Sequence, residues 1–145
     1  MKNKSKRFEE SHNSRTYFIF DENHLEYGIL AYFSLSFKEI SLDPNISKSE
    51  KKLLDGISKI PDKVRVFLLG QIAKNDIRNN PIKLPEIFEE IYNILFAVQK
   101  KIGGRALLLE CEDNSKLISL YEKEGFKILQ KQDLVQMYKM INFIK

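Results

Sequence analysis

The sequence predicts an α+β domain in which helices pack on a mixed β-sheet. Segments whose apolar residues alternate with a period of two are interleaved, along the 145 residues, with segments whose apolar residues repeat at helical spacing. The composition has 43% hydrophobic residues, six glycines and four prolines, which excludes collagen-like, low-complexity and wholly disordered chains. We expect residues 16–145 to form one domain and residues 1–15 to be a mobile basic tail or the remnant of a helix.

Cysteine, histidine and charge content narrow the class further. The single cysteine, Cys111, and two histidines exclude a disulfide scaffold and a thiolate-rich zinc site, so we expect no metal and a cytoplasmic location. No apolar run approaches the roughly 20 residues of a membrane-spanning helix, so we expect no membrane partner. The net charge of +4 fits an anionic partner of any kind and does not by itself indicate nucleic acid.

The amino-terminal part predicts an antiparallel hairpin. Thr16–Phe20 is rich in β-forming residues, and residues 21–24 supply turn-forming side chains. Apolar residues then alternate from Tyr27 to Phe37, which predicts a second strand with one apolar face.

A short helix and a long strand follow the hairpin. Ser47 and Glu50 have the spacing of a capping box, which predicts a helix that ends near Ile60, before the next proline. Residues 64–73 form a strand long enough to cross a sheet, and Gly70 within it predicts a bulge or a close approach of the backbone to a neighbour.

Helices and strands alternate in the rest of the chain. After the polar loop 74–83, Pro85 begins a helix whose apolar residues repeat at helical spacing until Gly103 and Gly104 end it. The remaining predicted elements are a strand over 105–111, a helix over 115–124 and strands over 126–129 and 135–141. The predicted order is β-β-α-β-α-β-α-β-β, with a mixed sheet.

One segment, Asn114–Phe126, carries a family resemblance. It reads NSKLISLYEKEGF, and it closely resembles the carboxyl-terminal signature of the GCN5-related N-acetyltransferases (GNAT), in which an asparagine at a strand end precedes a helix bearing Leu-Tyr-Glu-Lys-x-Gly-Phe. Further similarity to a bacterial and phage branch lies at Ser14–Tyr17, Gly103–Arg105 and Leu107–Glu110. The resemblance implies a three-layer α/β/α fold with a central mixed, mostly antiparallel sheet, and direct transfer of acetyl from acetyl-CoA to an amine.

The resemblance also implies where acetyl-CoA binds. Two central parallel strands of this fold diverge, and the pantetheine arm fills the gap as a surrogate strand. Here these would be the strand that ends at Lys74 and the strand that ends at Cys111. The pyrophosphate would lie at the loop before the Pro85 helix, where the helix dipole favours anions. The predicted cofactor-binding residues are Gln71, Ile72, Ala73, Lys74, Arg78, Asn79, Asn80, Lys83 and Asn114.

Tyr121 and Glu110 are the predicted catalytic residues. Family members use the tyrosine at this motif position to protonate the departing coenzyme A thiolate, and a phenol with a reference pKa of about 10 can donate that proton. Glu110 is the predicted general base, on the ground of its position at a strand end. Asn114 would tie the strand end to the helix or contact the cofactor.

The chain departs from the family pattern in two places. The family's phosphate-binding signature contains glycines, whereas residues 74–86 contain none; Pro85 lacks an amide, and Glu86 puts negative charge in the first helical turn. The family also begins with a strand and two helices that form one wall of the acceptor site, and only fifteen residues precede Thr16. These departures point to reduced or lost cofactor affinity, and to an acceptor site that is open or completed by a partner subunit.

Three functions therefore stay open. The first is an acetyl-CoA-dependent N-acetyltransferase with an unidentified amine acceptor. The alternatives are a catalytically degenerate GNAT-fold binding module, and a toxin-like acetyltransferase that acts on aminoacyl-tRNA, in which case tRNA would be the nucleic-acid partner. The resemblance is compatible with a homodimer but does not specify one.

Overall fold

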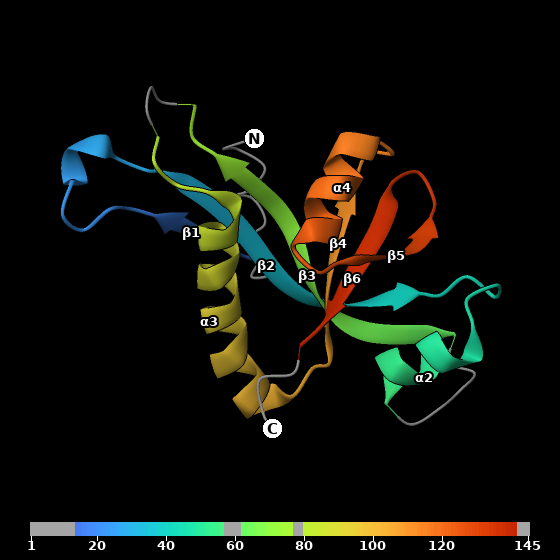
Figure 1. The fold of residues 1–145 in the computed structure, drawn as a ribbon. Coiled ribbons are helices and arrows are strands. Elements are labelled where there is room, and N and C mark those ends of the chain that lie inside the picture. The colour runs from blue at the N-terminus through green and yellow to red at the C-terminus, as the bar shows by residue number, and fades with distance from the viewer. Residues whose placement is uncertain (1–13, 57–61, 77–79, 142–145) are drawn as a thin grey trace. The chain divides into compact units, whose positions relative to one another are not determined.

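The computed structural model describes residues 14–56, 62–76 and 80–141 (Figure 1). Six strands form one sheet in the order β1-β2-β3-β4-β6-β5. The strands are β1 (Arg15–Ile19), β2 (Ala31–Ser41), β3 (Lys63–Lys74), β4 (Ala106–Cys111), β5 (Lys127–Lys131) and β6 (Val135–Met140), and the helices are α2 (Lys48–Asp55), α3 (Leu84–Ile102) and α4 (Ser115–Lys123). The order along the chain is the predicted one. Contacts divide the chain into a first unit, Met1–Ser36 with Leu69–Val98, and a second unit, Phe37–Leu68 with Gln99–Lys145.

The first unit contains the predicted hairpin. β1 pairs antiparallel with β2, with Arg15 opposite Leu35, and the rings of Tyr17 and Phe33 stack 5.3 Å apart. The prediction that the second strand begins at Tyr27 is wrong, because Leu25–Tyr27 form a turn of 3₁₀ helix and β2 begins at Ala31. The cause is local, since turn hydrogen bonds continue beyond residue 24 and the amide of Tyr27 donates to the carbonyl of His24.

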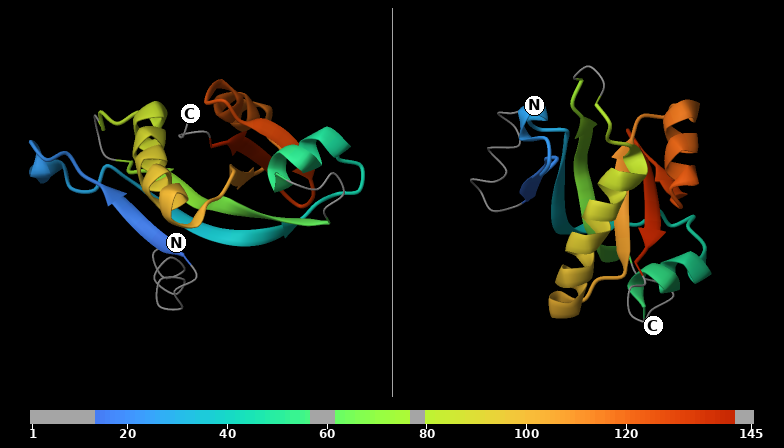
Figure 2. Two further views of the ribbon diagram at one scale, coloured as in Figure 1. Left: turned by 90° about the horizontal axis from the view of Figure 1, so that it is seen from below. Right: turned by 60° about the vertical axis from the view of Figure 1, so that its left-hand side comes forward.

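The second unit holds two helices on opposite faces of its strands (Figure 2). Leu54 of α2 packs in one core cluster with Leu108 of β4 and Tyr138 of β6. Lys139, the next residue of β6, extends to the other face, where its Nζ donates 2.8 Å to the carbonyl of Glu124 at the end of α4. Helix, sheet and helix are the three layers of this unit, with antiparallel pairing of β4 with β6 and of β5 with β6.

Glycines set two boundaries in the second unit. Gly56 has φ 91°, a left-handed conformation, and its amide caps α2 by donating 2.7 Å to the carbonyl of Lys52. The prediction that this helix continues to Ile60 is therefore wrong, and residues 57–61 lie outside the described residues. Gly104, with φ 118°, lies against Phe67, where an added Cβ would come within 2.2 Å of a ring carbon. No other residue fits at this position without displacing the ring.

The other predicted elements agree within a few residues. β3 covers the predicted strand, and a Cβ on Gly70 would lie 3.0 Å from Ser34 Oγ of β2, in keeping with the predicted close approach. α3 begins at Leu84, one residue before the predicted start, and Gly103 (φ 79°) follows its last residue. No helix within the described ranges is long and apolar enough to cross a membrane.

We expect removal of the Tyr138 hydroxyl to change how stability depends on alkaline pH. The hydroxyl donates 2.9 Å to Glu50 Oε2 of α2, and burial together with this hydrogen bond raises the pKa of Tyr138 to about 12. An unfolded tyrosine titrates near 10, so the stabilisation is complete below about pH 10 and is lost as the pH rises through about 12. Tyr138→Phe should lower the free energy of unfolding by about 1–2 kcal/mol at pH 8 and reduce the loss between pH 10 and 12.

Urea unfolding at pH 8, 10 and 11.5 measures both effects. Tyr27→Phe, at a tyrosine that is 42% exposed, is the matched control and should leave the unfolding curves unchanged. Parallel pH dependences for the wild type and Tyr138→Phe would contradict the assignment.

Candidate active site

Tyr121 is fixed near the carboxyl end of α4 and is 8% exposed. Its ring meets that of Phe126 edge to face at 6.3 Å, and its carbonyl accepts the Phe126 amide at 3.1 Å where the helix ends. Burial, and in smaller part interaction with Cys111, raise the pKa of the Tyr121 phenol above its ordinary value. Tyr121 therefore holds its proton at neutral pH and can act as a proton donor.

Asn114 organises the start of the same helix. Its Oδ1 accepts the amides of Lys116 at 2.9 Å and Leu117 at 3.3 Å, which is the N-cap arrangement. Two roles were expected for Asn114, a link between the strand end and the helix or a contact with the cofactor. The N-cap is the first of these, because it ties the end of β4 to α4. The motif thus has a structural basis, because the cap fixes where α4 begins and hence where Tyr121 lies.

Cys111 ends β4 and is buried, with 8% of its surface exposed. Burial, and then the nearby charge of Asp113, raise the pKa of the Cys111 thiol. A thiol whose pKa is raised is a poor nucleophile at neutral pH, since the thiolate is the reactive form. Cys111 therefore packs beside Tyr121 as a small apolar side chain.

Glu110 lies on the face of β4 opposite to the Cys111 side chain. Successive residues of a strand point to opposite faces, and Glu110 is paired in register with Gln136 of β6. Glu110 Oε2 accepts a hydrogen bond from Gln136 Nε2 at 3.3 Å, while the residue remains exposed to solvent. The two predicted catalytic residues, Tyr121 and Glu110, therefore belong to one unit but lie toward different faces of β4.

The predicted cofactor residues of β3 lie in the first unit. Gln71, Ile72 and Ala73 are partly buried and Lys74 is exposed, all in the last part of β3. Glu110, Asn114 and Tyr121 lie in the second unit. The predicted divergence of β3 from β4 involves residues of both units, and it stays a prediction.

The loop before α3 is held together by asparagine side chains. Asn80 Nδ2 donates 2.8 Å to the carbonyl of Leu30 and 2.8 Å to that of Asn75, and its Oδ1 accepts the amide of Ile82 at 3.1 Å. Asn75 Nδ2 donates 2.6 Å to the carbonyl of Ile29. Asn80 thus braces the loop against the residues before β2. The predicted residues Arg78 and Asn79 lie outside the described residues.

The first turn of α3 satisfies most of its own amides. Glu86 Oε1 accepts the amide of Lys83 at 3.1 Å, and the carbonyl of Lys83 accepts the amides of Glu86 and Ile87 at 3.0 and 3.2 Å. Pro85 has no amide hydrogen. Among the described residues of this turn, the Leu84 amide is therefore the remaining donor for which no acceptor is found. Glu86 follows Lys83 by three residues, as the glutamate of a capping box follows its N-cap residue. The sequence did not predict this cap, because lysine is not a usual N-cap residue.

Sequence reasoning also missed two buried glutamines, Gln130 of β5 and Gln136 of β6, whose side chains connect to Glu110. The sequence feature that could have revealed them is a glutamine within a predicted strand whose neighbouring residues are apolar. Within the part of the chain that the structure describes, no three histidine, cysteine or carboxylate side chains are grouped to hold a metal ion.

Comparison with known proteins supports the fold. No family model and no curated protein matches the sequence. Among solved structures, AtaT complexed with acetyl-methionyl-tRNA is 20% identical with a TM-score of 0.72, covering 96% of this chain and 78% of that one. A KacT variant is 19% identical with a TM-score of 0.69 (94% and 76% covered), and AtaTR bound with acetyl-CoA is 19% identical with a TM-score of 0.67 (93% and 74% covered).

These neighbours are toxins with the GNAT acetyltransferase fold. The described strands and helices, in the order given above, therefore form a GNAT fold, as the Asn114–Phe126 motif predicts.

The burial of Cys111 predicts low reactivity of its thiol. At pH 7.5 we expect iodoacetamide to alkylate the native protein at least about tenfold more slowly than the urea-unfolded protein, because the thiolate is disfavoured and shielded. Mass spectrometry of timed samples measures both rates. Equal rates in the two states would mean that the Cys111 sulfur is accessible and ionised, and would reopen a covalent role.

Proposed function

We propose that this protein is an acetyl-CoA-dependent N-acetyltransferase that transfers the acetyl group directly to an amine. The observation that carries the proposal is Tyr121, a buried phenol that keeps its proton and lies on α4 in the family's motif, beside the Cys111 end of β4. The GNAT fold and an acetyl-CoA complex of a structural neighbour, AtaTR, support it.

The reaction requires an acid and a base in different places. The amine nitrogen attacks the thioester carbonyl carbon, the C–S bond then breaks, and the sulfur leaves as a thiolate. Tyr121 donates its proton to that sulfur, and Glu110 accepts the proton that the amine loses. The direct path has no acyl-enzyme, in keeping with the raised pKa of Cys111.

The two faces of β4 give each group its role. If the pantetheine arm extends along β4 as a surrogate strand, its thioester presents one side to each face of the sheet. The acceptor amine would then approach from the face of Glu110, while Tyr121 reaches the sulfur from the face that carries α4.

The first unit would hold the rest of the cofactor. The backbone of Gln71, Ile72 and Ala73 would pair with the pantetheine amides, and Lys74 and Lys83, with Arg78, would balance the pyrophosphate charge. Among the described residues of the first turn of α3, the Leu84 amide is the backbone donor left for a phosphate oxygen, and the negative charge of Glu86 would oppose anion binding nearby. These features favour weak acetyl-CoA binding, and they are also what a catalytically degenerate binding module would have.

Acetyl-CoA titration of the wild type and Tyr121→Phe tests the function. We expect similar cofactor affinity by calorimetry for both proteins, because the proton is needed only as the thiolate leaves, and roughly a 100-fold lower rate of acetyl transfer for the variant. No heat and no thermal shift at millimolar acetyl-CoA would favour the degenerate module. Undiminished transfer by Tyr121→Phe would refute the role of Tyr121.

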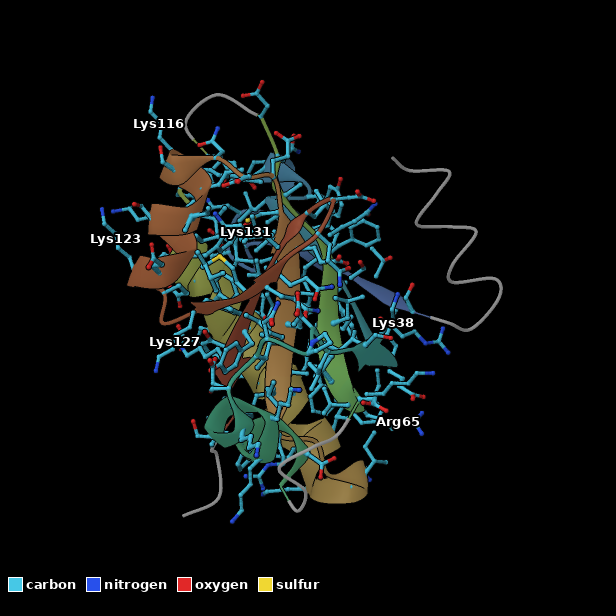
Figure 3. All side chains as sticks on the ribbon, turned by 90° about the vertical axis from the view of Figure 1, so that its right-hand side faces the viewer. Lys38, Arg65, Lys116, Lys123, Lys127 and Lys131 are labelled. Carbon is cyan, nitrogen blue, oxygen red and sulfur yellow. The ribbon has the colours of Figure 1, made fainter. Side chains whose placement is uncertain are left out.

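For the acceptor we favour aminoacyl-tRNA. AtaT was solved with acetyl-methionyl-tRNA, and the charge of this chain is unevenly distributed. The second unit has 16 Lys and Arg against 11 Asp and Glu, whereas the first has 8 against 9. Exposed cations of the second unit include Lys38, Arg65, Lys116, Lys123, Lys127 and Lys131 (Figure 3). The net positive charge of the second unit would attract a polyanion such as tRNA.

The remaining expectations are part of the same proposal. A cytoplasmic, bacterial acetyltransferase fits the absence of a cysteine framework in the sequence and the kind of toxin that it resembles. A homodimer, or another subunit that completes the acceptor site, stays a prediction.

Neutralising two lysines of α4 tests the acceptor. We expect the double substitution Lys116→Gln and Lys123→Gln to weaken binding of methionyl-tRNA. The slope of log K against log salt should become less steep by about 1 for each phosphate group that the variant no longer neutralises. Filter binding between 50 and 200 mM salt measures this, and Lys101→Gln, at the end of α3, is the control. An unchanged slope would exclude α4 from the RNA surface.

A further inference from the structure

Two buried glutamines form a chain of hydrogen bonds that ends at Glu110. Gln130 and Gln136 are 6% and 7% exposed. Gln130 Oε1 accepts the amide of Asp43 at 2.8 Å, and Gln130 Nε2 donates to the carbonyl of Ser41 at 3.0 Å and to Gln136 Oε1. Gln136 Nε2 then donates to Glu110 Oε2 at 3.3 Å. The chain connects the end of β2 with β5, β6 and β4.

The backbone fixes the direction of every bond in this chain. The Asp43 amide can only donate and the Ser41 carbonyl can only accept, so the orientation of the Gln130 amide has no alternative. Gln130 Nε2 in turn faces Gln136 Oε1, which leaves Gln136 Nε2 toward Glu110. The carboxylate is therefore offered a hydrogen-bond donor, and Glu110 Oε1 is left without a partner among the described residues.

A β-bulge places Gln130 in this chain. The β5–β6 register shifts between Ile128 and Gln130, so that Gln130, not Leu129, is opposite Gln136. Leu129 meanwhile packs in the core cluster with Leu108 and Tyr138, so two consecutive residues of β5 turn to the same face. Regular alternation would send Gln130 to the face of α4, away from Gln136.

We propose that Gln136, held by Gln130, is a positioning residue that fixes the Glu110 carboxylate for accepting the amine proton. This rests on the proposed function. Two buried amides cost free energy that apolar side chains of similar size avoid, and only a complete set of partners offsets it. Here the chain ends on an exposed carboxylate, with one oxygen bound and the other available for the substrate.

Side-chain amide NMR tests the chain without using activity. The Gln136 NH₂ resonances should move when Glu110 is replaced in Glu110→Gln, because Gln136 Nε2 then loses the carboxylate as its acceptor. Gln99, whose Nε2 donates 2.7 Å to the carbonyl of Gly104 and 3.2 Å to that of Ile141, is the internal control and should not respond. A Gln136 amide that is indifferent to Glu110 overturns the proposal.

Kinetics with acetyl-CoA and methionyl-tRNA test the positioning. We expect Glu110→Gln to lower kcat roughly 100-fold, and Gln136→Met and Gln130→Met each about 10-fold with KM for acetyl-CoA unchanged. In the Glu110→Gln background, Gln136→Met should cause no further loss, because it acts through the carboxylate. Gln99→Met should keep wild-type kcat even if it unfolds more easily.

The outcomes separate the two proposals. Full activity of Glu110→Gln overturns the catalytic role of Glu110, and with it the positioning role of Gln136, whatever the NMR result. A wild type that transfers no acetyl group to this tRNA overturns the proposed acceptor, and the NMR result then decides the positioning proposal. An inactive Glu110→Gln beside a fully active Gln136→Met overturns the positioning role alone, as does a further 10-fold loss in the double variant.

Discussion

The alternation of side chains along β4 is the constraint on which the second unit depends. Leu108 and Glu110 point to the face covered by α2, whereas the next residue, Cys111, points to the face of α4. One strand therefore supplies core contacts to both helices and still presents two chemically different groups at its carboxyl end. A shift of one residue in the pairing of β4 with β6 would exchange these faces, bury Glu110 beside Tyr121 and separate it from Gln136. The register of this pair thus determines both the stability of the unit and the chemistry available to it.

The order of elements and the GNAT fold could be predicted because both follow from local patterns. Period-two alternation gave the hairpin, helical spacing gave α3, and the Asn114–Phe126 motif gave α4 together with its cap. The boundaries that were wrong depend on single residues in unusual conformations: Gly56 ends α2 before Ile60, and a 3₁₀ turn takes Tyr27 out of the strand. The relation of Glu110 to Gln136 could not be predicted, because a strand pairing 26 residues apart and a bulge in β5 determine it.

The start of α3 shows how a helix terminus can be completed from within. In a glycine-rich loop the first amides stay free, and the helix dipole then attracts an anion. Here Glu86 Oε1 accepts the Lys83 amide, the Lys83 carbonyl accepts the Glu86 amide and Pro85 has no amide, while Asn80 Nδ2 donates to the carbonyls of Leu30 and Asn75. Such a terminus stabilises the fold in the absence of ligand. A phosphate group bound there, as proposed, would depend on lysine and arginine charge, which acts over distance but fixes geometry poorly.

The separation of Tyr121 from Glu110 by the strand itself suits direct acetyl transfer better than an acyl-enzyme path. An acyl-enzyme would need a nucleophile on the thioester's path with a base beside it, yet Cys111, the thiol at that strand end, is buried and has a raised pKa. Direct transfer instead needs a donor where the sulfur leaves and an acceptor where the amine arrives, on two sides of one carbonyl carbon. In the proposed reaction, a strand whose successive side chains point to opposite faces would supply that arrangement with two neighbouring positions, one bearing the carboxylate and one packing against the phenol. The hydrogen-bond chain through Gln136 and Gln130 then has a physical reason: an exposed carboxylate at a strand end has no packing to hold it, and a buried amide fixed by backbone groups supplies the missing constraint.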